Sequence, residues 1–168
     1  MSFALWLTGL SGSGKSAIAG ALLAELQARG VRVAVLESDV MRTQLTPSAR
    51  YDEAERQFFY RALADIGALL AKEVAVIFDA TANRREYRSR ARSAILRFAE
   101  VYVSTPIEVC AARDPKGLYK SKNVRTLPGV QTDYEPPLSP ELVVSGARGT
   151  PAEAAAEVLA LLERRGWL

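Results

Sequence analysis

Eight consecutive residues near the start of the 168-residue chain restrict its fold more than any other feature. They run from Gly9 to Ser16 as Gly-Leu-Ser-Gly-Ser-Gly-Lys-Ser and match G-x-x-x-x-G-K-[ST] at every fixed position. An apolar run, 3–7, precedes them, and an Ala- and Leu-rich segment, 17–28, follows them. Glycines let the backbone turn its N–H groups inward, and a following helix adds the positive end of its dipole. The sequence therefore predicts a phosphate-cradling loop between a buried strand and a helix.

This kind of loop, the P-loop, occurs in kinases, GTPases and motor ATPases, so other features must separate these classes. The chain carries no guanine-reading N-K-x-D motif, and 168 residues are too few for the second lobes of most mechanical ATPases. A small-molecule kinase with ATP as its donor is therefore the predicted class. A glycine-rich turn that matches the pattern by chance is the alternative, and the strand and helix patterns on either side argue against it.

Short apolar runs alternate with helical patterns along the rest of the chain. In 53–72, for example, apolar residues recur at three- and four-residue steps, which indicates an amphipathic helix. Such alternation predicts an α/β protein: a three-layer P-loop NTPase fold, with a five-stranded parallel sheet and helices on both faces. The predicted strands are 3–7, 31–36, 74–78, 101–103 and 142–144. The predicted helices are 17–28, 53–72, 84–98, 106–113 and 151–162.

The length suits a single P-loop kinase domain that spans 1–168. Within it, the segment from about 114 to 140 is rich in Pro, Gly, Lys and Thr and shows little periodicity. A loop of this length is too long for a simple connector and is typical of a functional segment. We expect it to form a lid over the site.

Composition limits the partners and the location of the chain. Twenty-two Lys and Arg against nineteen Asp and Glu give a net charge of +3, which fits a small anionic acceptor and argues against a nucleic-acid partner. No apolar run approaches the roughly 20 residues of a membrane span. The single cysteine, Cys110, forms no internal disulfide, which is consistent with the expected cytoplasmic location. The oligomeric state is left open, and a homodimer is one form the sequence allows.

The P-loop assigns roles to its own residues. Lys15 is expected to be catalytic and to reach the β- and γ-phosphates, and the Ser16 hydroxyl is expected to bind Mg²⁺, the predicted cofactor. The predicted ATP-binding residues are Gly9, Ser11, Gly12, Ser13, Gly14, Lys15, Ser16, Ala17 and Arg113.

Two carboxylates, Asp39 and Asp79, follow predicted strands, and ligands of parallel sheets bind at the carboxyl ends of the strands. Either group could complete the Mg²⁺ shell or orient the acceptor hydroxyl. Asp79 ends the apolar run 74–78 as a metal-binding aspartate of P-loop enzymes does, so it is predicted to bind Mg²⁺ with Ser16. Asp39 is better placed to face the acceptor. A helix N-cap is the alternative role for each.

Arginines provide candidate anion-binding groups. Arg42 and Arg56 flank the expected acceptor pocket, and guanidinium groups bind phosphate or sulfate oxygens in bidentate fashion. A solvated surface is the alternative for both. Six further arginines crowd the helix predicted over 84–98. Most of them are expected to face solvent, with one or two as candidates to reach ATP.

The stretch 101–120, VYVSTPIEVCAARDPKGLYK, resembles one family of P-loop kinases, the adenylylsulfate (APS) kinases. Its R-D-P-K-G-L-Y-K run is nearly identical in type to the family's own, and 134–137 and 140–141 resemble the family's lid. The resemblance covers nearly the whole chain. It implies that ATP and adenylyl sulfate react to give ADP and 3′-phosphoadenylyl sulfate.

The resemblance also implies a set of acceptor-binding residues. One carboxylate, which would be catalytic, faces the ribose 3′-hydroxyl, and two arginines grip the phosphosulfate. Two lysines close over the anions, and two further side chains lie on opposite faces of the adenine. In this chain the corresponding residues are Asp39, Arg42, Arg56, Lys116, Lys120, Tyr51 and Leu127.

Several positions on the acceptor side depart from the family's pattern. Phe59 stands where the family has a substrate-contacting Asn, and Ala82 stands where some members carry a phosphorylatable Ser. Leu127 replaces a stacking Phe of the lid, and Asp79 is unlike the usual family residue. A related kinase that acts on another small anionic, nucleotide or polynucleotide acceptor is therefore the alternative function. A non-catalytic nucleotide sensor is the third hypothesis, and the joint presence of four candidate site residues argues against it. These residues are Lys15, Ser16, Asp39 and Asp79.

Overall fold

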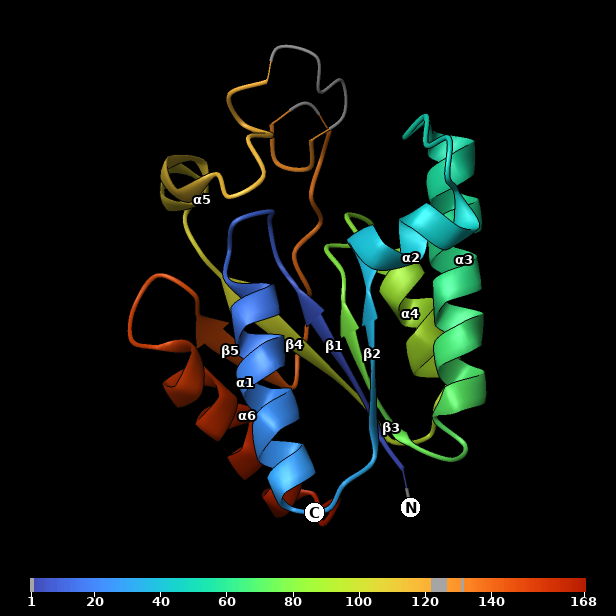
Figure 1. Ribbon diagram of the computed structural model, residues 1–168, viewed down its shortest axis with the longest axis vertical. Coiled ribbons are helices and arrows are strands. Elements are labelled where there is room, and N and C mark those ends of the chain that lie inside the picture. Colours follow the sequence, from blue (N-terminus) through green and yellow to red (C-terminus); the bar gives the residue numbers. More distant parts are fainter. Residues whose placement is uncertain (1, 122–126, 131) are drawn as a thin grey trace.

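The computed structural model describes residues 2–121, 127–130 and 132–168. Within them, the strands are β1 (Ala4–Thr8), β2 (Val33–Glu37), β3 (Ala75–Asp79), β4 (Phe98–Ser104) and β5 (Leu142–Ser145). The helices are α1 (Lys15–Ala28), α2 (Ser38–Leu45), α3 (Glu53–Leu70), α4 (Arg85–Ala94), α5 (Ile107–Arg113) and α6 (Pro151–Arg164). The strands form one parallel sheet in the order β2-β3-β1-β4-β5 (Figure 1). The predicted α/β class and five-stranded parallel sheet are confirmed.

The central strand β1 explains why the sequence begins with a continuous apolar run. It pairs with β3 on one side and β4 on the other, and all five of its residues are buried. Leu5 and Leu7 pack in the cluster that includes α1 and α6, whereas Ala4 and Trp6 pack in the cluster that includes α3 and α4. Both faces of the sheet are therefore covered, as Figure 1 shows, and three layers result.

The largest error in the predicted elements lies between α4 and β4. The helix ends at Ala94 rather than at 98, and the strand begins at Phe98 rather than at 101. Phe98 pairs with Ala4 of β1 and is buried. It therefore belongs to the sheet, although the arginine-rich pattern predicted that the helix extends to this residue. Glu100 interrupts the apolar pattern of β4 and hides the start of the strand. A helix at α2 is predicted only in the alternative that makes Asp39 an N-cap, and the structure starts this helix at Ser38.

The first described part of 114–140 lies beyond the carboxyl ends of the strands, next to α5, and the last part runs back along the sheet to β5 (Figure 1). The described residues of this segment form no helix or strand, and one isolated bridge joins Pro128 to Thr132. Part of the predicted lid, 122–126 and 131, lies outside the described residues. In the part of the chain that is described, no helix has the length and apolar character needed to span a membrane.

Candidate active site

The P-loop connects β1 to α1 with a backbone that favours glycine at three positions, Gly9, Gly12 and Gly14. Gly9 and Gly12 have φ angles of 154° and 77°. A Cβ at Gly9 would lie 2.5 Å from the Val103 carbonyl oxygen, and a Cβ at Gly12 would lie 2.8 Å from the Cys110 carbonyl oxygen. The loop is thus pressed against β4 and α5. Among the described residues no side chain caps the first turn of α1, which leaves its N–H groups for an anion.

Lys15 lies inside this loop with only 8% of its surface exposed. Its Nζ donates hydrogen bonds to the carbonyl oxygens of Gly9 and Leu10, both at 2.9 Å. Burial lowers the pKa of Lys15 to about 8, and the nearby Asp79 carboxylate opposes that shift. An incoming polyphosphate would supply the negative charge that this buried ammonium lacks.

Asp79 ends β3 and is buried beside the loop. Its carboxylate and the Ser16 hydroxyl line the same cavity, and hard oxygen donors of this kind suit Mg²⁺. Within the described residues no group of three or more His, Cys, Asp or Glu forms a dedicated metal cage. Because Mg²⁺ retains waters and takes phosphate oxygens as ligands, two protein oxygens fit the ion in a nucleotide site. Asp79 lies within a strand, so it is not a helix N-cap.

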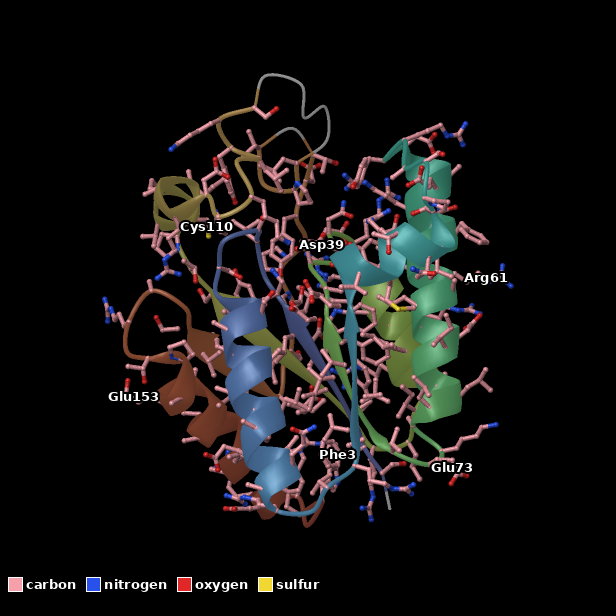
Figure 2. The ribbon with its side chains drawn as sticks, viewed as in Figure 1. Phe3, Asp39, Arg61, Glu73, Cys110 and Glu153 are labelled. Carbon is pink, nitrogen blue, oxygen red and sulfur yellow. The ribbon has the colours of Figure 1, made fainter. Side chains whose placement is uncertain are left out.

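A cavity of about 850 Å³ joins the P-loop to the acceptor side of the molecule. It lies along the carboxyl edge of the sheet, where Figure 2 labels Asp39, at the end opposite Phe3 and Glu73. The predicted site residues that line it are Ser11, Gly12, Gly14, Lys15, Ser16, Ala17, Asp39, Arg42, Tyr51, Arg56, Asp79, Arg113, Lys116 and Leu127. Three predicted site residues do not line it, namely Gly9, Ser13 and Lys120. The structure therefore gathers most of both predicted sets in one space.

The residues outside the cavity wall have other surroundings. Ser13 is fully buried, and its carbonyl oxygen accepts a 2.8 Å hydrogen bond from the Thr105 hydroxyl. Lys120 is exposed, and its backbone N–H donates to the Asp114 carboxylate at 3.2 Å. Gly9 and Ser13 thus belong to the P-loop without lining the cavity. Lys120 belongs to the segment that follows α5 and also lies outside the cavity wall.

The two acceptor-side arginines are not on a solvated surface. Arg42 and Arg56 are 9% and 8% exposed, although both line the cavity. Arg42 Nη1 lies 3.3 Å from the Glu55 carboxylate, and Arg56 Nε donates to the Tyr51 carbonyl oxygen at 3.2 Å. Burial lowers the pKa of Arg56. Two buried guanidinium groups therefore line this end of the cavity.

Asp39 lies in the first turn of α2 and pairs with Lys116 from the segment after α5. The N-cap residue of α2 is Glu37, so Asp39 is not the cap. Its carboxylate is therefore not committed to the helix end. Both partners of the ion pair line the cavity.

Residues 145–151 form a part of the cavity wall that the sequence analysis missed. Gly146 packs so closely on the P-loop that a Cβ there would lie 1.8 Å from the Ser13 carbonyl oxygen. At the end of this segment, Thr150 and Glu153 form a capping box that starts α6. The sequence does contain a pattern that could have identified this segment, namely S-G-x-x-G-T-P before an Ala-rich run, which is typical of a turn that leads into a helix. This segment and Arg113 line the cavity together with the P-loop.

Arg88 corrects the expectation that the arginines of 84–98 face solvent or ATP. Its side chain is 1% exposed and donates to Glu100 at 2.5 Å and to the Glu135 carbonyl oxygen at 2.7 Å. Glu135 also accepts from the Arg85 N–H at 2.8 Å and donates its own N–H to the Asn83 carbonyl oxygen at 2.8 Å. These contacts fasten the returning end of 114–140 to the start of α4.

Comparison with known proteins bears directly on this cavity. The family model for adenylylsulphate kinase matches residues 1–145. The chain belongs to this family. The adenylyl-sulfate kinase of Microcystis aeruginosa is 38% identical over 168 residues, which is 98% of this chain and 93% of that protein. The expected class of ATP-dependent phosphotransferase is therefore confirmed.

Two further relatives of this adenylylsulphate kinase family member are informative. The APS kinase of Mycobacterium tuberculosis, solved in complex with AMPPNP and APS, is 34% identical with a TM-score of 0.88, and the match covers 96% of this chain and 98% of that one. A probable bifunctional SAT/APS kinase of Sorangium cellulosum is 38% identical over 99% of this chain. The chain spans 29% of the length of that bifunctional protein. The match to the Mycobacterium tuberculosis structure confirms the predicted P-loop kinase fold.

Proposed function

We propose that this chain transfers the γ-phosphoryl group of ATP to the 3′-hydroxyl of adenylyl sulfate, giving ADP and 3′-phosphoadenylyl sulfate. One observation carries the proposal: a single cavity has the P-loop at one end and two buried arginines at the other. Such a space accepts two nucleotides with their reacting groups between Lys15 and Asp39. Family membership supports adenylyl sulfate as the acceptor.

At the donor end, the P-loop N–H groups and Lys15 would bind the β- and γ-phosphates and stabilise charge on the transferred group. Ser16 and Asp79 would hold Mg²⁺, which when bound neutralises charge on the phosphate oxygens. Arg113 and 145–151 would surround the nucleoside of ATP. Lys15 would then exchange its two carbonyl partners for phosphate oxygens.

At the acceptor end, Arg42 and Arg56 would bind the phosphosulfate through charge-assisted hydrogen bonds. Their buried positions strengthen this interaction because the surroundings screen charge less than water does. Tyr51 and Leu127 would flank the adenine on opposite faces. Two buried guanidinium groups at this end favour an anionic acceptor over a neutral alcohol.

Asp39 would orient the 3′-hydroxyl and accept its proton as the new P–O bond forms. Its carboxylate is paired with Lys116. We propose that Lys116 exchanges Asp39 for an anionic group of the substrates when 114–140 closes, with Lys120 moving in the same segment. Closure would exclude water and so suppress wasteful hydrolysis of ATP.

The test is a coupled ADP-release assay with adenylyl sulfate, other nucleotides and sugar alcohols as separate acceptors. We expect strong stimulation by micromolar adenylyl sulfate and a product whose mass matches 3′-phosphoadenylyl sulfate. Stimulation by another acceptor alone would reassign the substrate to the alternative class. Slow ADP release that no acceptor changes would instead favour the nucleotide sensor.

A further inference from the structure

Phe59 has a contact that its place in the sequence does not reveal. It lies on α3, is 0% exposed, and stands where the family's pattern has an Asn. Its ring centroid is 4.0 Å from Cζ of Arg42. A phenyl ring has no hydrogen-bonding group, so Phe59 cannot take over an amide's contacts with a substrate. Any effect it has on the acceptor must pass through a neighbour.

The guanidinium of Arg42 is held from several sides. Besides Phe59, the rings of Tyr51 and Tyr60 have centroids 4.9 Å and 5.8 Å from its Cζ. Glu55 approaches one nitrogen, Nη1, at 3.3 Å. These partners come from α3 and the turn before it, whereas Arg42 comes from α2. The contact therefore joins two elements at the acceptor end of the cavity.

We propose that Phe59 is a positioning residue for the acceptor: it holds the Arg42 guanidinium in place so that the phosphosulfate meets an ordered anion-binding group. This inference rests on the proposed function, because it assumes that Arg42 binds the acceptor's anion. It makes Phe59 a determinant of acceptor affinity although the ring itself touches no reacting atom.

Elementary energetics support this role. A free arginine side chain has many rotamers, and fixing them only when a ligand binds weakens affinity. An aromatic ring attracts the face of a guanidinium and leaves the N–H groups at its edge directed elsewhere. Arginine has five such donors, and Glu55 is near one nitrogen, so donors are left for a second anion. Stacking thus orders Arg42 without consuming its donors.

The competing explanation is that Phe59 only fills the core. It belongs to the cluster under α3 and α4, and its ring lies edge-on to Tyr60 with centroids 5.1 Å apart. Replacing it therefore removes core contacts as well. The experiment must separate loss of packing from loss of Arg42 placement.

We would measure steady-state kinetics of Phe59→Leu, Phe59→Met and Phe59→Tyr, with adenylyl sulfate and ATP varied separately. Loss of the ring in the Leu and Met variants should raise KM for adenylyl sulfate about five- to tenfold, in line with a partly desolvated cation–π contact. KM for ATP and kcat should change less than about twofold, because the P-loop is untouched. Phe59→Tyr keeps a ring and should stay near wild type. Unchanged KM for adenylyl sulfate in both the Leu and Met variants would overturn the inference.

A neighbouring residue gives the matched control. Phe58 precedes Phe59 on α3 but is 57% exposed and lies outside the cavity wall. Phe58→Leu makes the same chemical change and should alter neither KM. An equal rise in KM for adenylyl sulfate in this variant would show that the effect belongs to α3 in general and would overturn the role of Phe59.

A double-mutant cycle distinguishes positioning from packing. If Phe59 acts through Arg42, Phe59→Met should raise the dissociation constant for adenylyl sulfate in the wild-type background and leave it unchanged in an Arg42→Ala background. Equal effects in both backgrounds would mean packing only. A wild-type enzyme that adenylyl sulfate does not stimulate would remove the proposed function and this inference together. An active wild type with additive effects removes the inference alone.

Discussion

The ammonium group of Lys116 pairs with the carboxylate of Asp39, which ties the segment after α5 to the first turn of α2. The two side chains are 47% and 53% exposed. Exposed ion pairs of this kind contribute only about 0–1 kcal/mol to stability. The contact is therefore weak enough for a substrate to replace either partner. It joins the proposed catalytic carboxylate to the proposed lid.

The first prediction concerns that carboxylate. Asp39→Asn keeps the shape of the side chain but cannot accept the proton of the 3′-hydroxyl, so kcat should fall by about 10²–10⁴-fold. KM for ATP should stay within about twofold, since Lys15 and the P-loop are unchanged. Steady-state kinetics with both substrates varied checks this. The control is Asp65→Asn, an exposed carboxylate that pairs with Arg90 outside the cavity. Wild-type turnover in Asp39→Asn would remove Asp39 from its role.

The sequence predicted the parts of the site that depend on local backbone demands. The P-loop could be recognised because its conformation requires glycine at Gly9 and Gly12, whatever the rest of the chain does. The strands could be found because a strand covered on both faces is mostly apolar, as β1 is from Ala4 to Leu7. Both features can be recognised from a few neighbouring residues.

What the sequence did not predict depends on packing between distant segments. Gly146 contacts Ser13, which lies more than a hundred residues earlier in the chain, and no local sequence pattern predicts this contact. Arg88 is one of many arginines on its helix, and only the fold shows that it faces Glu100 rather than solvent. The contact of Phe59 with Arg42 depends in the same way on how α2 meets α3.

The pH dependence of stability should report the burial of Lys15. Its pKa is lowered from 10.5 to about 8, so between these pH values the folded chain binds fewer protons than the unfolded chain. The free energy of unfolding that Lys15 contributes therefore rises with pH across this window, by on the order of 2 kcal/mol.

Lys15→Met removes this titration. We would measure the free energy of unfolding of both proteins with denaturant at pH 7.5 and pH 10. The variant should be more stable than wild type at pH 7.5, and this difference should shrink at pH 10. A stability difference between the two proteins that does not change with pH would contradict the buried, pKa-shifted ammonium.

A pair of glycines tests the close approach of 145–151 to the P-loop. Gly146→Ala places a methyl group 1.8 Å from the Ser13 carbonyl oxygen, so the backbone must move. We expect KM for ATP to rise about tenfold or more, because displaced phosphate-binding groups lose alignment. Thermal unfolding and ATP kinetics of the same preparation measure both consequences.

Gly20→Ala is the matched control. This glycine lies within α1, and a Cβ there would meet no atom within 4 Å. Because alanine is the better helix former, the variant should be more stable by about 0.5–1 kcal/mol and have unchanged kinetics. If Gly146→Ala behaves as Gly20→Ala does, the two loops do not need their close contact.

The last prediction concerns the metal. If Asp79 and Ser16 hold Mg²⁺, Asp79→Asn weakens one oxygen ligand and should raise the Mg²⁺ concentration for half-maximal activity about tenfold or more. Excess Mg²⁺ should restore part of the activity, and EDTA should abolish it in wild type and variant alike. Glu73→Gln, at the opposite end of the sheet in Figure 2, should leave the Mg²⁺ dependence unchanged. A titration of Asp79→Asn that superimposes on wild type would place the ion on other ligands and free Asp79 to serve the acceptor, the role that its position at the end of β3 equally allows.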